Sequence, residues 1–309
     1  MKTLRIGTRG SELALAQTQQ AIAAMQAAVP GLVCEICIIS TAGDQRTDIP
    51  LHQVNAATGT GDKGVFIAAI EEALAAGEVD CAVHSLKDMP GVLAPGFALA
   101  AVLPREEVQD VLVIKENADR EQPVIATGSV RRSHLVQTYW QGRARTVPVR
   151  GNVATRLRKL AGAADVSATL LARAGLNRLG YDRHSFEVDG VKLQVLDLPL
   201  QDFPPALGQG AIALECRAGD SEVMQILERV NDAPTYRCIA CERAFLNLLQ
   251  ADCSVPVGGH AFLLPDGSLT LHVVHYDAAG KRTVLERNGK DPEALAAALH
   301  ADLLAALRS

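Results

Sequence analysis

A lysine and an aspartate stand side by side where an apolar stretch of the sequence ends. Cys81-Ala82-Val83-His84-Ser85 has the composition of a buried strand, and Leu86-Lys87-Asp88-Met89-Pro90 follows it directly. A carboxylate held at the carboxyl end of a strand could stabilise a developing cation or move a proton. The alternative is a solvated turn before a proline, which is the commoner origin of such a stretch. Asp88 is therefore a candidate catalytic residue, with Lys87 and Ser85 as its neighbours.

Arginines occupy three turns of one kind. Each turn follows a predicted strand and opens a predicted helix, where outward-pointing backbone N–H groups favour anions. Arginine also binds carboxylates through paired hydrogen bonds, and ligands of open α/β sheets bind beyond the carboxyl ends of strands. Three such turns on two α/β blocks indicate a cleft for a molecule with several carboxylates. The turns are 8–11, with Arg9; 128–132, with Arg131 and Arg132; and 149–156, with Arg150 and Arg156.

One glycine-rich stretch suggests a different class of enzyme. Gly59-Thr60-Gly61-Asp62-Lys63-Gly64 matches G-x-G-x-x-G and precedes a predicted helix. The dinucleotide-binding turn requires a strand that leads directly into it, and residues 53–58 are polar and lack a strand pattern. Nucleotide binding is therefore the weaker interpretation. Residues 41–61 instead resemble a long loop of the kind that often forms a lid.

The seven cysteines are an odd number scattered through a long chain, which indicates reduced thiols rather than a disulfide framework. Cys34 with Cys37 and Cys238 with Cys241 form two C-x-x-C pairs that could bind zinc. Positions three apart in a strand point to opposite faces, so buried, inert thiols are the favoured interpretation and zinc the minor one. Cys253 lies in a loop near prolines and glycines, and its spacing alone defines no chemistry.

Length and composition predict an ordinary globular protein. The chain has 309 residues, of which 48% are hydrophobic and 21% charged, enough for two or three domains. A net charge of -5 gives no overall attraction to nucleic acid or to an anionic membrane. No apolar run approaches a membrane span, and the N-terminus enters a strand without a secretory segment, so we expect a cytoplasmic protein without a membrane or nucleic-acid partner.

Predicted elements divide the chain into two alternating blocks and a different last third. Strand–helix–strand with short connections predicts parallel sheets in the first two blocks. In the last third, two helices, a hairpin at 262–274 and a closing helix at 292–307 predict a small α+β domain. The strands predicted in the alternating blocks are 3–8, 32–40, 80–85, 111–114, 124–127, 146–149, 169–172 and 211–214. The predicted helices begin near Ser11, Val65, Ser129, Val153, Ser221, Tyr236 and Pro292.

Taken together, these stretches resemble the porphobilinogen deaminase (hydroxymethylbilane synthase) family, nearly end to end. The order and completeness of the motifs make the resemblance specific. The matching stretches are 5–17, 63–66, 84–90, 128–132, 150–157, 174–179, 208–211 and 253–256. The chain departs from the family at Arg173, where an apolar residue is usual.

The family resemblance implies the architecture and the activity. It implies two α/β domains with crossing connections, like periplasmic binding proteins, and a small α+β domain. The implied boundaries are 1–103 with 197–219, 104–196, and 220–309. The implied reaction is deamination and head-to-tail joining of four porphobilinogens on a covalent dipyrromethane cofactor, which releases hydroxymethylbilane for tetrapyrrole and haem biosynthesis. The resemblance also implies that the protein is a monomer, that it binds no metal, and that it passes its product to uroporphyrinogen-III synthase.

The resemblance also assigns site residues. It implies Asp88 as the catalytic residue and Cys253 as the covalent attachment of the cofactor. Around the cofactor it implies Ser85, Lys87, Ser129, Arg131, Arg132 and Arg150. Around the substrate it implies Arg9, Ser11, Gln17, Lys63, Phe66, Arg150, Arg156, Arg178 and Gln209. The alternative is a non-catalytic protein whose cleft binds a polycarboxylate, which would require neither Asp88 nor a covalent anchor.

Overall fold

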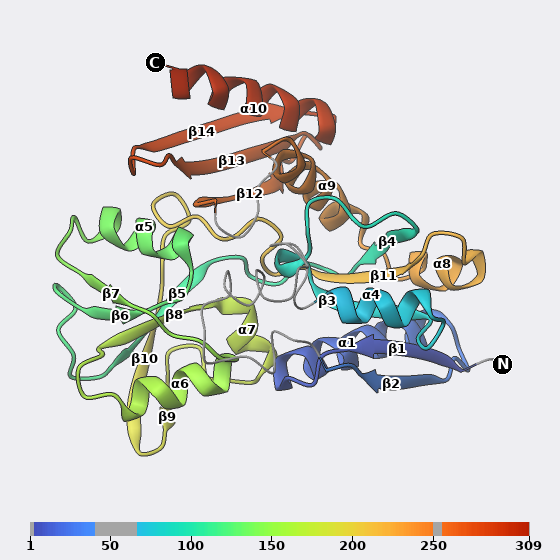
Figure 1. The fold of residues 1–309 in the computed structure, drawn as a ribbon, viewed down its shortest axis with the longest axis horizontal. Coiled ribbons are helices and arrows are strands. Elements are labelled where there is room, and N and C mark those ends of the chain that lie inside the picture. The colour runs from blue at the N-terminus through green and yellow to red at the C-terminus, as the bar shows by residue number, and fades with distance from the viewer. Residues whose placement is uncertain (1–2, 41–66, 250–254, 309) are drawn as a thin grey trace.

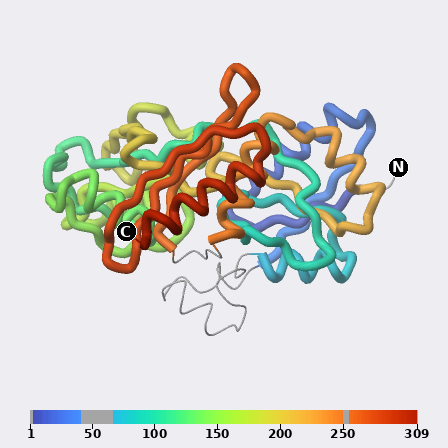
Figure 2. The backbone as a smooth tube through the Cα atoms, turned by 90° about the horizontal axis from the view of Figure 1, so that it is seen from above, coloured from blue at the N-terminus to red at the C-terminus, as the bar shows by residue number. Residues whose placement is uncertain are grey.

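Three β-sheets with their helices form three units in the computed structural model, which describes residues 3–40, 67–249 and 255–308 (Figure 1). We call them the first, second and third unit in the order in which their sheets begin. The third unit lies over the junction of the other two when the molecule is seen from above (Figure 2). The predicted fold class, two α/β parts and a small α+β part, is confirmed. The domain boundaries themselves stay a prediction.

The first unit is a five-stranded mixed sheet between helices. β1 pairs in parallel with β2 and β3, as predicted, whereas β11 returns from the second unit and runs antiparallel between β3 and β4. Helices α1 and α8 pack on one face and α4 on the other. The strands are β1 (Leu4–Thr8), β2 (Cys34–Ile38), β3 (Cys81–Ser85), β4 (Phe97–Val102) and β11 (Ile212–Arg217), and the helices α1 (Glu12–Ala28), α4 (Ala68–Ala75) and α8 (Ser221–Glu228).

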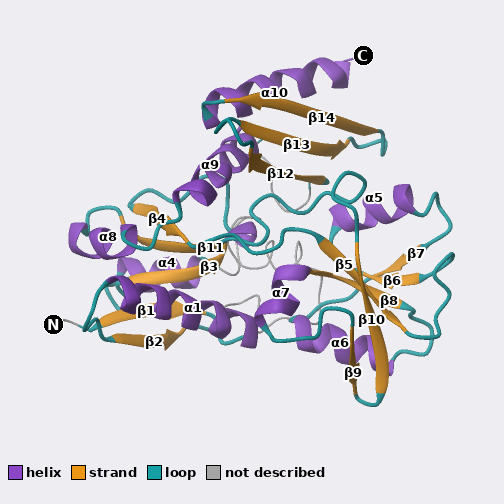
Figure 3. Ribbon diagram, turned by 180° about the vertical axis from the view of Figure 1, so that it is seen from behind, coloured by secondary structure: helices purple, strands orange, loops and turns teal. Residues whose placement is uncertain are grey.

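The second unit repeats this plan with six strands in the order β7-β6-β8-β5-β10-β9. Its parallel strands are β6, β7 and β8, and β5 enters antiparallel. Helix α5 covers one face and α6 the other (Figure 3). The strands are β5 (Asp110–Lys115), β6 (Val124–Ala126), β7 (Arg145–Val147), β8 (Ala168–Ala172), β9 (Ser185–Val188) and β10 (Val191–Asp197), and the helices α5 (Val130–Tyr139), α6 (Val153–Gly162) and α7 (Arg173–Arg178).

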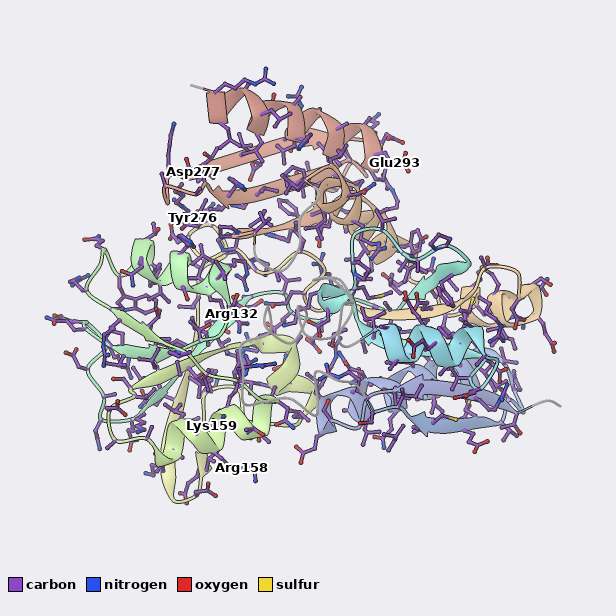
Figure 4. All side chains as sticks on the ribbon, in the orientation of Figure 1. Arg132, Arg158, Lys159, Tyr276, Asp277 and Glu293 are labelled. Carbon is purple, nitrogen blue, oxygen red and sulfur yellow. The ribbon has the colours of Figure 1, made fainter. Side chains whose placement is uncertain are left out.

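The third unit is an antiparallel sheet with two helices on one face. Its core side chains come from that face of the sheet and from α9 and α10. Tyr276, on the other face, lies above α5 (Figure 4) and stacks on His134, with ring centroids 4.9 Å apart. The strands are β12 (Val257–Leu263), β13 (Leu269–Tyr276) and β14 (Arg282–Gly289), and the helices α9 (Ala233–Leu248) and α10 (Pro292–Arg308).

Two crossover segments, residues 103–109 and 198–211, connect the first and second units. They touch each other, because Glu106 N donates to Gly210 O at 3.1 Å. Five elements were not predicted from the sequence: β4, β9, β10, β14 and α7. No helix within 3–40, 67–249 and 255–308 is long and apolar enough to span a membrane.

Arg173, for which the sequence offered no explanation, is a buried structural residue. Its side chain is 1% exposed and donates to Asp197 Oδ1 through Nη2 at 2.6 Å and Nε at 2.9 Å. Nη1 donates to the carbonyl of Arg183 at 3.0 Å. Arg173 therefore fastens α7 to the end of β10, where the second crossover segment begins.

Candidate active site

The stretch that ends β3 places Asp88 at the surface. β3 stops at Ser85, and a single 3-10 turn, η1 (Leu86–Asp88), follows. Leu86 and Met89 are buried and fasten this turn to the core, whereas Asp88 is exposed. The predicted position of Asp88, directly after a buried strand, is confirmed.

Ser85 is held by Gln17 of α1. Gln17 is 3% exposed, and its Nε2 donates to Ser85 Oγ at 2.9 Å. The Ser85 hydroxyl lies 3.0 Å from Gln17 Oε1, to which it donates. Gln17 was predicted to contact the substrate. The structure uses its side chain to brace the end of β3, one turn away from Asp88.

Lys87 joins the first unit to the second crossover segment. Its Nζ donates to Gln209 Oε1 at 3.2 Å. The pKa of the Lys87 ammonium is lowered to about 8, chiefly by burial and then by the positive charge of Arg132, whereas Asp88 and Asp110 act in the opposite direction. Lys87 is therefore mostly charged at neutral pH and yet loses its proton more readily than an ordinary lysine.

Arg131 and Arg132 converge on a buried carboxylate, Asp110, which the sequence analysis did not anticipate. Arg131 Nη2 donates to Oδ2 at 2.8 Å, and Arg132 donates to Oδ1 through Nη2 at 2.7 Å and to Oδ2 through Nε at 3.2 Å. Burial alone would raise the pKa of Asp110, but the two arginines outweigh burial and hold that pKa well below its usual range. Asp110 begins an apolar run, and nothing in its local sequence distinguishes it from an ordinary strand end.

The turn at 208–210 puts Gln209 between these groups. Gly208 and Gly210 have φ of +80° and +88°, a region that favours glycine. A Cβ on Gly208 would lie 2.8 Å from Leu86 Cδ2, and one on Gly210 would lie 2.4 Å from Glu106 O. Gln209 itself is fully buried. We therefore revise its predicted role as a substrate contact, because a side chain with no exposed surface lies behind the site.

The three predicted arginine turns are confirmed as strand-to-helix turns, β1 to α1, β6 to α5 and β7 to α6. A polar side chain caps each helix. Ser11 accepts from Ala14 N at 3.3 Å, and Ser129 accepts from Arg132 N at 3.4 Å. Arg9 lies just before the first of these caps and is partly exposed. The turns thus bring helix N-termini and arginines to one edge of each sheet.

Arg156, from the third turn, belongs to the same charged neighbourhood as Asp88 and Arg132. Its Nε donates to Gly151 O at 2.8 Å. The pKa of Arg156 is lowered to about 10, chiefly by burial and also by the positive charges of Arg132 and Arg150, whereas Asp88 opposes them. Arg132 lies on the inner side of the second unit, towards the first unit (Figure 4). The structure therefore gathers these side chains around the junction of the two α/β units.

Other predicted site residues lie elsewhere or outside the described chain. Arg178 donates from Nη2 to the carbonyl of Gly210 at 2.7 Å and so connects α7 to the second crossover segment. Lys63, Phe66 and Cys253 lie outside the described residues, as does the glycine-rich stretch 59–64.

The cysteine pairs do not form one zinc site. Cys34 and Cys37 lie on β2 of the first unit, whereas Cys238 and Cys241 are buried in the core of the third. Burial raises the pKa of the Cys238 thiol to about 11 and that of Cys241 to about 12. In the described part of the chain, no cluster of three or more histidine, cysteine or acidic side chains could hold a metal.

A second buried carboxylate, Glu242 of α9, attaches the third unit to both crossover segments. Arg105 donates to it through Nη1 at 2.6 Å and Nη2 at 3.1 Å. Glu242 also accepts from Gly208 N at 2.5 Å and from Ala261 N at 2.7 Å. Ala261 lies within β12, so this carboxylate fastens that strand to α9.

The electrostatic balance of the site favours anions. Lys87, Arg131 and Arg132 carry three positive charges, and Asp110 is the buried carboxylate between them. Two positive charges therefore remain unbalanced beside the exposed Asp88, and Arg156 adds another. A ligand with several carboxylates would meet cations at this junction, and one carboxylate would stay available for a cationic centre.

Comparisons with known proteins decide the family. A family model described as "Porphobilinogen deaminase, dipyromethane cofactor binding domain" matches residues 4–225, and the C-terminal domain model of the same family matches residues 236–307. The chain belongs to the porphobilinogen deaminase family. The porphobilinogen deaminase of Syntrophobacter fumaroxidans is 41% identical over 275 residues, with 87% of this chain and 83% of the relative covered. That of Halalkalibacterium halodurans is 38% identical over 304 residues, with 94% and 90% covered.

Among solved structures, a substrate-binding domain of a putative amino acid transporter from Streptococcus pneumoniae shares 12% identity, with a TM-score of 0.40, over 74% of this chain and 90% of that one. A likeness of this size says nothing about function. The porphobilinogen deaminase matches instead account for the predicted motifs, because the first family model spans all three arginine turns, Asp88 and the turn at Gly208. The enzyme class predicted from the sequence is confirmed by these relatives.

Proposed function

We propose that this chain deaminates porphobilinogen and joins four of the resulting pyrrole units head-to-tail on a dipyrromethane cofactor attached to Cys253, releasing hydroxymethylbilane. The observation that carries the proposal is the site itself. An exposed carboxylate, Asp88, lies beside a cluster with two unbalanced positive charges, in a chain of the porphobilinogen deaminase family. Porphobilinogen bears an acetate and a propionate, and its deamination generates a cation, so both kinds of charge are required.

The residues present fit the implied cofactor. Dipyrromethane carries carboxylates, and the buried arginine pair with Lys87 forms a site whose charge is positive even after Asp110 is counted. When bound, the cofactor supplies the pyrrole end to which substrate units are joined. We infer that Ser85, Lys87, Ser129, Arg131, Arg132 and Arg150 hold it. Their donors are cationic or hydroxyl groups, which match carboxylate oxygens.

Asp88 has the chemistry for the catalytic role. A fixed carboxylate can accept hydrogen bonds from pyrrole N–H groups and offset the positive charge that develops when ammonia leaves. It can also receive the proton that is released when two pyrroles are joined. Asp88 is exposed, whereas Asp110 has its oxygens occupied by arginines, so Asp88 is the carboxylate within reach of a ligand.

The substrate carboxylates are assigned to the remaining cations. Arg150 and Arg156 open α6, and Arg9 and Ser11 precede α1, so both groups combine charge or a hydroxyl with a helix N-terminus. Lys63, Phe66 and Arg178 complete the predicted set, and they remain part of the proposal. Gln17 and Gln209 act indirectly, because each is buried behind a residue of the site.

We further infer that the protein acts as a monomer in the cytoplasm and hands its product to uroporphyrinogen-III synthase. Six described cysteines are free thiols, which suits a reducing compartment. Size-exclusion chromatography with light scattering tests the monomer, and a dimer at micromolar concentration would refute it.

The decisive experiment is the intact mass of the purified chain and of Cys253→Ser. We expect the wild-type chain to carry the added mass of one dipyrromethane and to colour with a pyrrole-reactive aldehyde. The Cys253→Ser chain should fold, show the unmodified mass and stay colourless, because a hydroxyl is a much weaker nucleophile than a thiolate. Cys241→Ser, in the core of the third unit, is the control and should keep the adduct. A wild-type chain of unmodified mass that binds polycarboxylates would support the binding-protein alternative.

A further inference from the structure

We propose that Asp110 and Gln209 are positioning residues that hold Lys87, Arg131 and Arg132 as one cationic array and keep Lys87 protonated for carboxylate binding. The proposal rests on the proposed function, since the array is assigned to the cofactor and substrate carboxylates. It adds two residues that touch no ligand but determine the geometry and the charge of those that do.

Gln209 has only one orientation that satisfies its neighbours. Its Nε2 donates to Asp110 Oδ1 at 2.8 Å and to Val108 O at 2.7 Å, and both of these oxygens can only accept. The amide oxygen must then point the other way, where Lys87 Nζ donates to it at 3.2 Å. The fully buried side chain of Gln209 therefore bridges Asp110 of the second unit and Lys87 of the first unit, and it fixes the position of one relative to the other.

Asp110 is saturated by its own neighbours. Its two oxygens accept from Arg131 Nη2, Arg132 Nη2, Arg132 Nε and Gln209 Nε2, at 2.7 to 3.2 Å. A carboxylate offers about four acceptor sites, so none is left for a ligand. Asp110 can therefore be neither the catalytic base nor a substrate contact, and its effect passes through the cations that it holds.

One negative charge among three positive ones has a calculable consequence for Lys87. The charged groups that face its ammonium are Asp88 of η1, Asp110 of β5, and Arg131 and Arg132 of α5. The arginines keep their protons at any working pH, so Lys87 is the member of the array that can lose one. Removing the Asp110 charge leaves two arginines and no buried counter-ion beside Lys87, and the protonated fraction of Lys87 falls.

The test measures the protonation of Lys87 directly. Competitive labelling with an amine-selective reagent between about pH 6 and pH 10, with the Lys87 peptide quantified by mass spectrometry, gives the midpoint of its titration. The wild-type midpoint is the reference, and a cofactor carboxylate bound to Lys87 would place it above the value of about 8 that applies to the chain without cofactor. In Asp110→Asn the midpoint should fall by on the order of one pH unit. The fraction of chains that carry the cofactor mass should fall with it.

Two further variants make the result interpretable. Gln209→Met keeps the volume and removes the amide that connects Asp110 to Lys87, and it too should lower the Lys87 midpoint. If Asp110→Asn does not fold, the titration midpoint of Lys87 in Gln209→Met serves as the test instead. Asp197→Asn is the matched control, because it removes the carboxylate partner of another buried arginine, Arg173, away from the array. We expect Asp197→Asn to unfold at lower urea concentration but to keep the wild-type midpoint and cofactor content.

The proposal is overturned if folded Asp110→Asn titrates Lys87 at the wild-type midpoint. If Asp110→Asn is unfolded, the same result in Gln209→Met overturns it. An equal fall in Asp197→Asn also overturns it, because the effect would then reflect general loosening of the fold. Failure of the proposed function is a different outcome. The wild-type chain would then lack the cofactor mass, whereas the Lys87 midpoint could still shift as expected.

Discussion

At the scale of single residues, the site contains two carboxylates whose surroundings differ. Asp110 is fully buried and bonded to Arg131, Arg132 and Gln209, whereas Asp88 is exposed on a short turn. The first balances charge within the protein, and the second can face a ligand. The sequence pattern around Asp88 made it a candidate catalytic residue, but no pattern pointed to Asp110.

Replacement of Asp88 tests its charge and its position separately. Asp88→Asn keeps the size and one acceptor oxygen but removes the negative charge, so we expect addition of substrate to slow by about 10²-fold or more. Asp88→Glu keeps the charge and moves it by about one methylene, which should leave weak but measurable activity. The measurement is single-turnover formation of enzyme–substrate adducts from porphobilinogen, with chains already loaded with cofactor. A loaded Asn variant that adds units at the wild-type rate would make Asp88 an ordinary turn residue.

At the scale of elements, caps and turns do most of the positioning. Ser11, Ser129 and Asn152 start the helices that follow the arginine turns, and each side chain accepts a backbone N–H inside the first helical turn. The hairpin of β9 and β10 turns at Asp189-Gly190, where both residues have positive φ. That dipeptide is a strong hairpin signal that the sequence analysis passed over.

The turn at 208–210 should tolerate no side chain at Gly210. Gly210→Ala combines positive φ with a Cβ 2.4 Å from the backbone oxygen of Glu106, so the crossover segments would have to separate. We expect a loss of at least about 2 kcal/mol in the free energy of unfolding. Urea denaturation followed by circular dichroism measures it.

The matched control for this change is Gly190→Ala. Gly190 has a similar φ of +79° and nothing within 4 Å of an added Cβ. Gly190→Ala should therefore lower the free energy of unfolding only by the backbone strain, about 1 kcal/mol. Equal losses in the two alanine variants would mean that the close approach of the crossover segments contributes nothing.

At the scale of the whole molecule, one buried ion pair joins all three units. Arg105 comes from the first crossover segment, Gly208 from the second and Glu242 from the third unit, and they meet at a carboxylate with no exposed surface. The Arg105 Nε also donates to the carbonyl of Gln209 at 2.9 Å. Docking of the third unit is therefore connected to the turn that holds Gln209.

Glu242→Gln should loosen this junction. Removing one charge from a buried pair typically costs about 3–5 kcal/mol, and the amide that remains can still accept some of the hydrogen bonds, so we expect about 2–3 kcal/mol. Trp140 is the single tryptophan of the chain and packs in a core cluster with Tyr276 of the third unit, so its fluorescence during urea unfolding reports on that contact.

Asp302→Asn is the control for Glu242→Gln. It removes the partner of Arg287 in an ion pair of the third unit whose side chains are 48% and 44% exposed, and such pairs contribute at most about 1 kcal/mol. If both variants unfold at the same urea concentration, the buried pair does not secure the third unit.

Local pattern was sufficient for the strand before Asp88, for the arginine turns and for the resemblance that led to the family, but not for α7, which carries Arg178. Apolar periodicity and capping residues act over a few neighbours, so β1, α1, β3 and the arginine turns could be predicted. Tertiary structure alone decided which charges meet. Gln209 contacts Asp110 across 99 residues and Glu242 contacts Arg105 across 137. Such pairs exist because two crossover segments and a third unit come together in space, and no local spacing encodes that encounter.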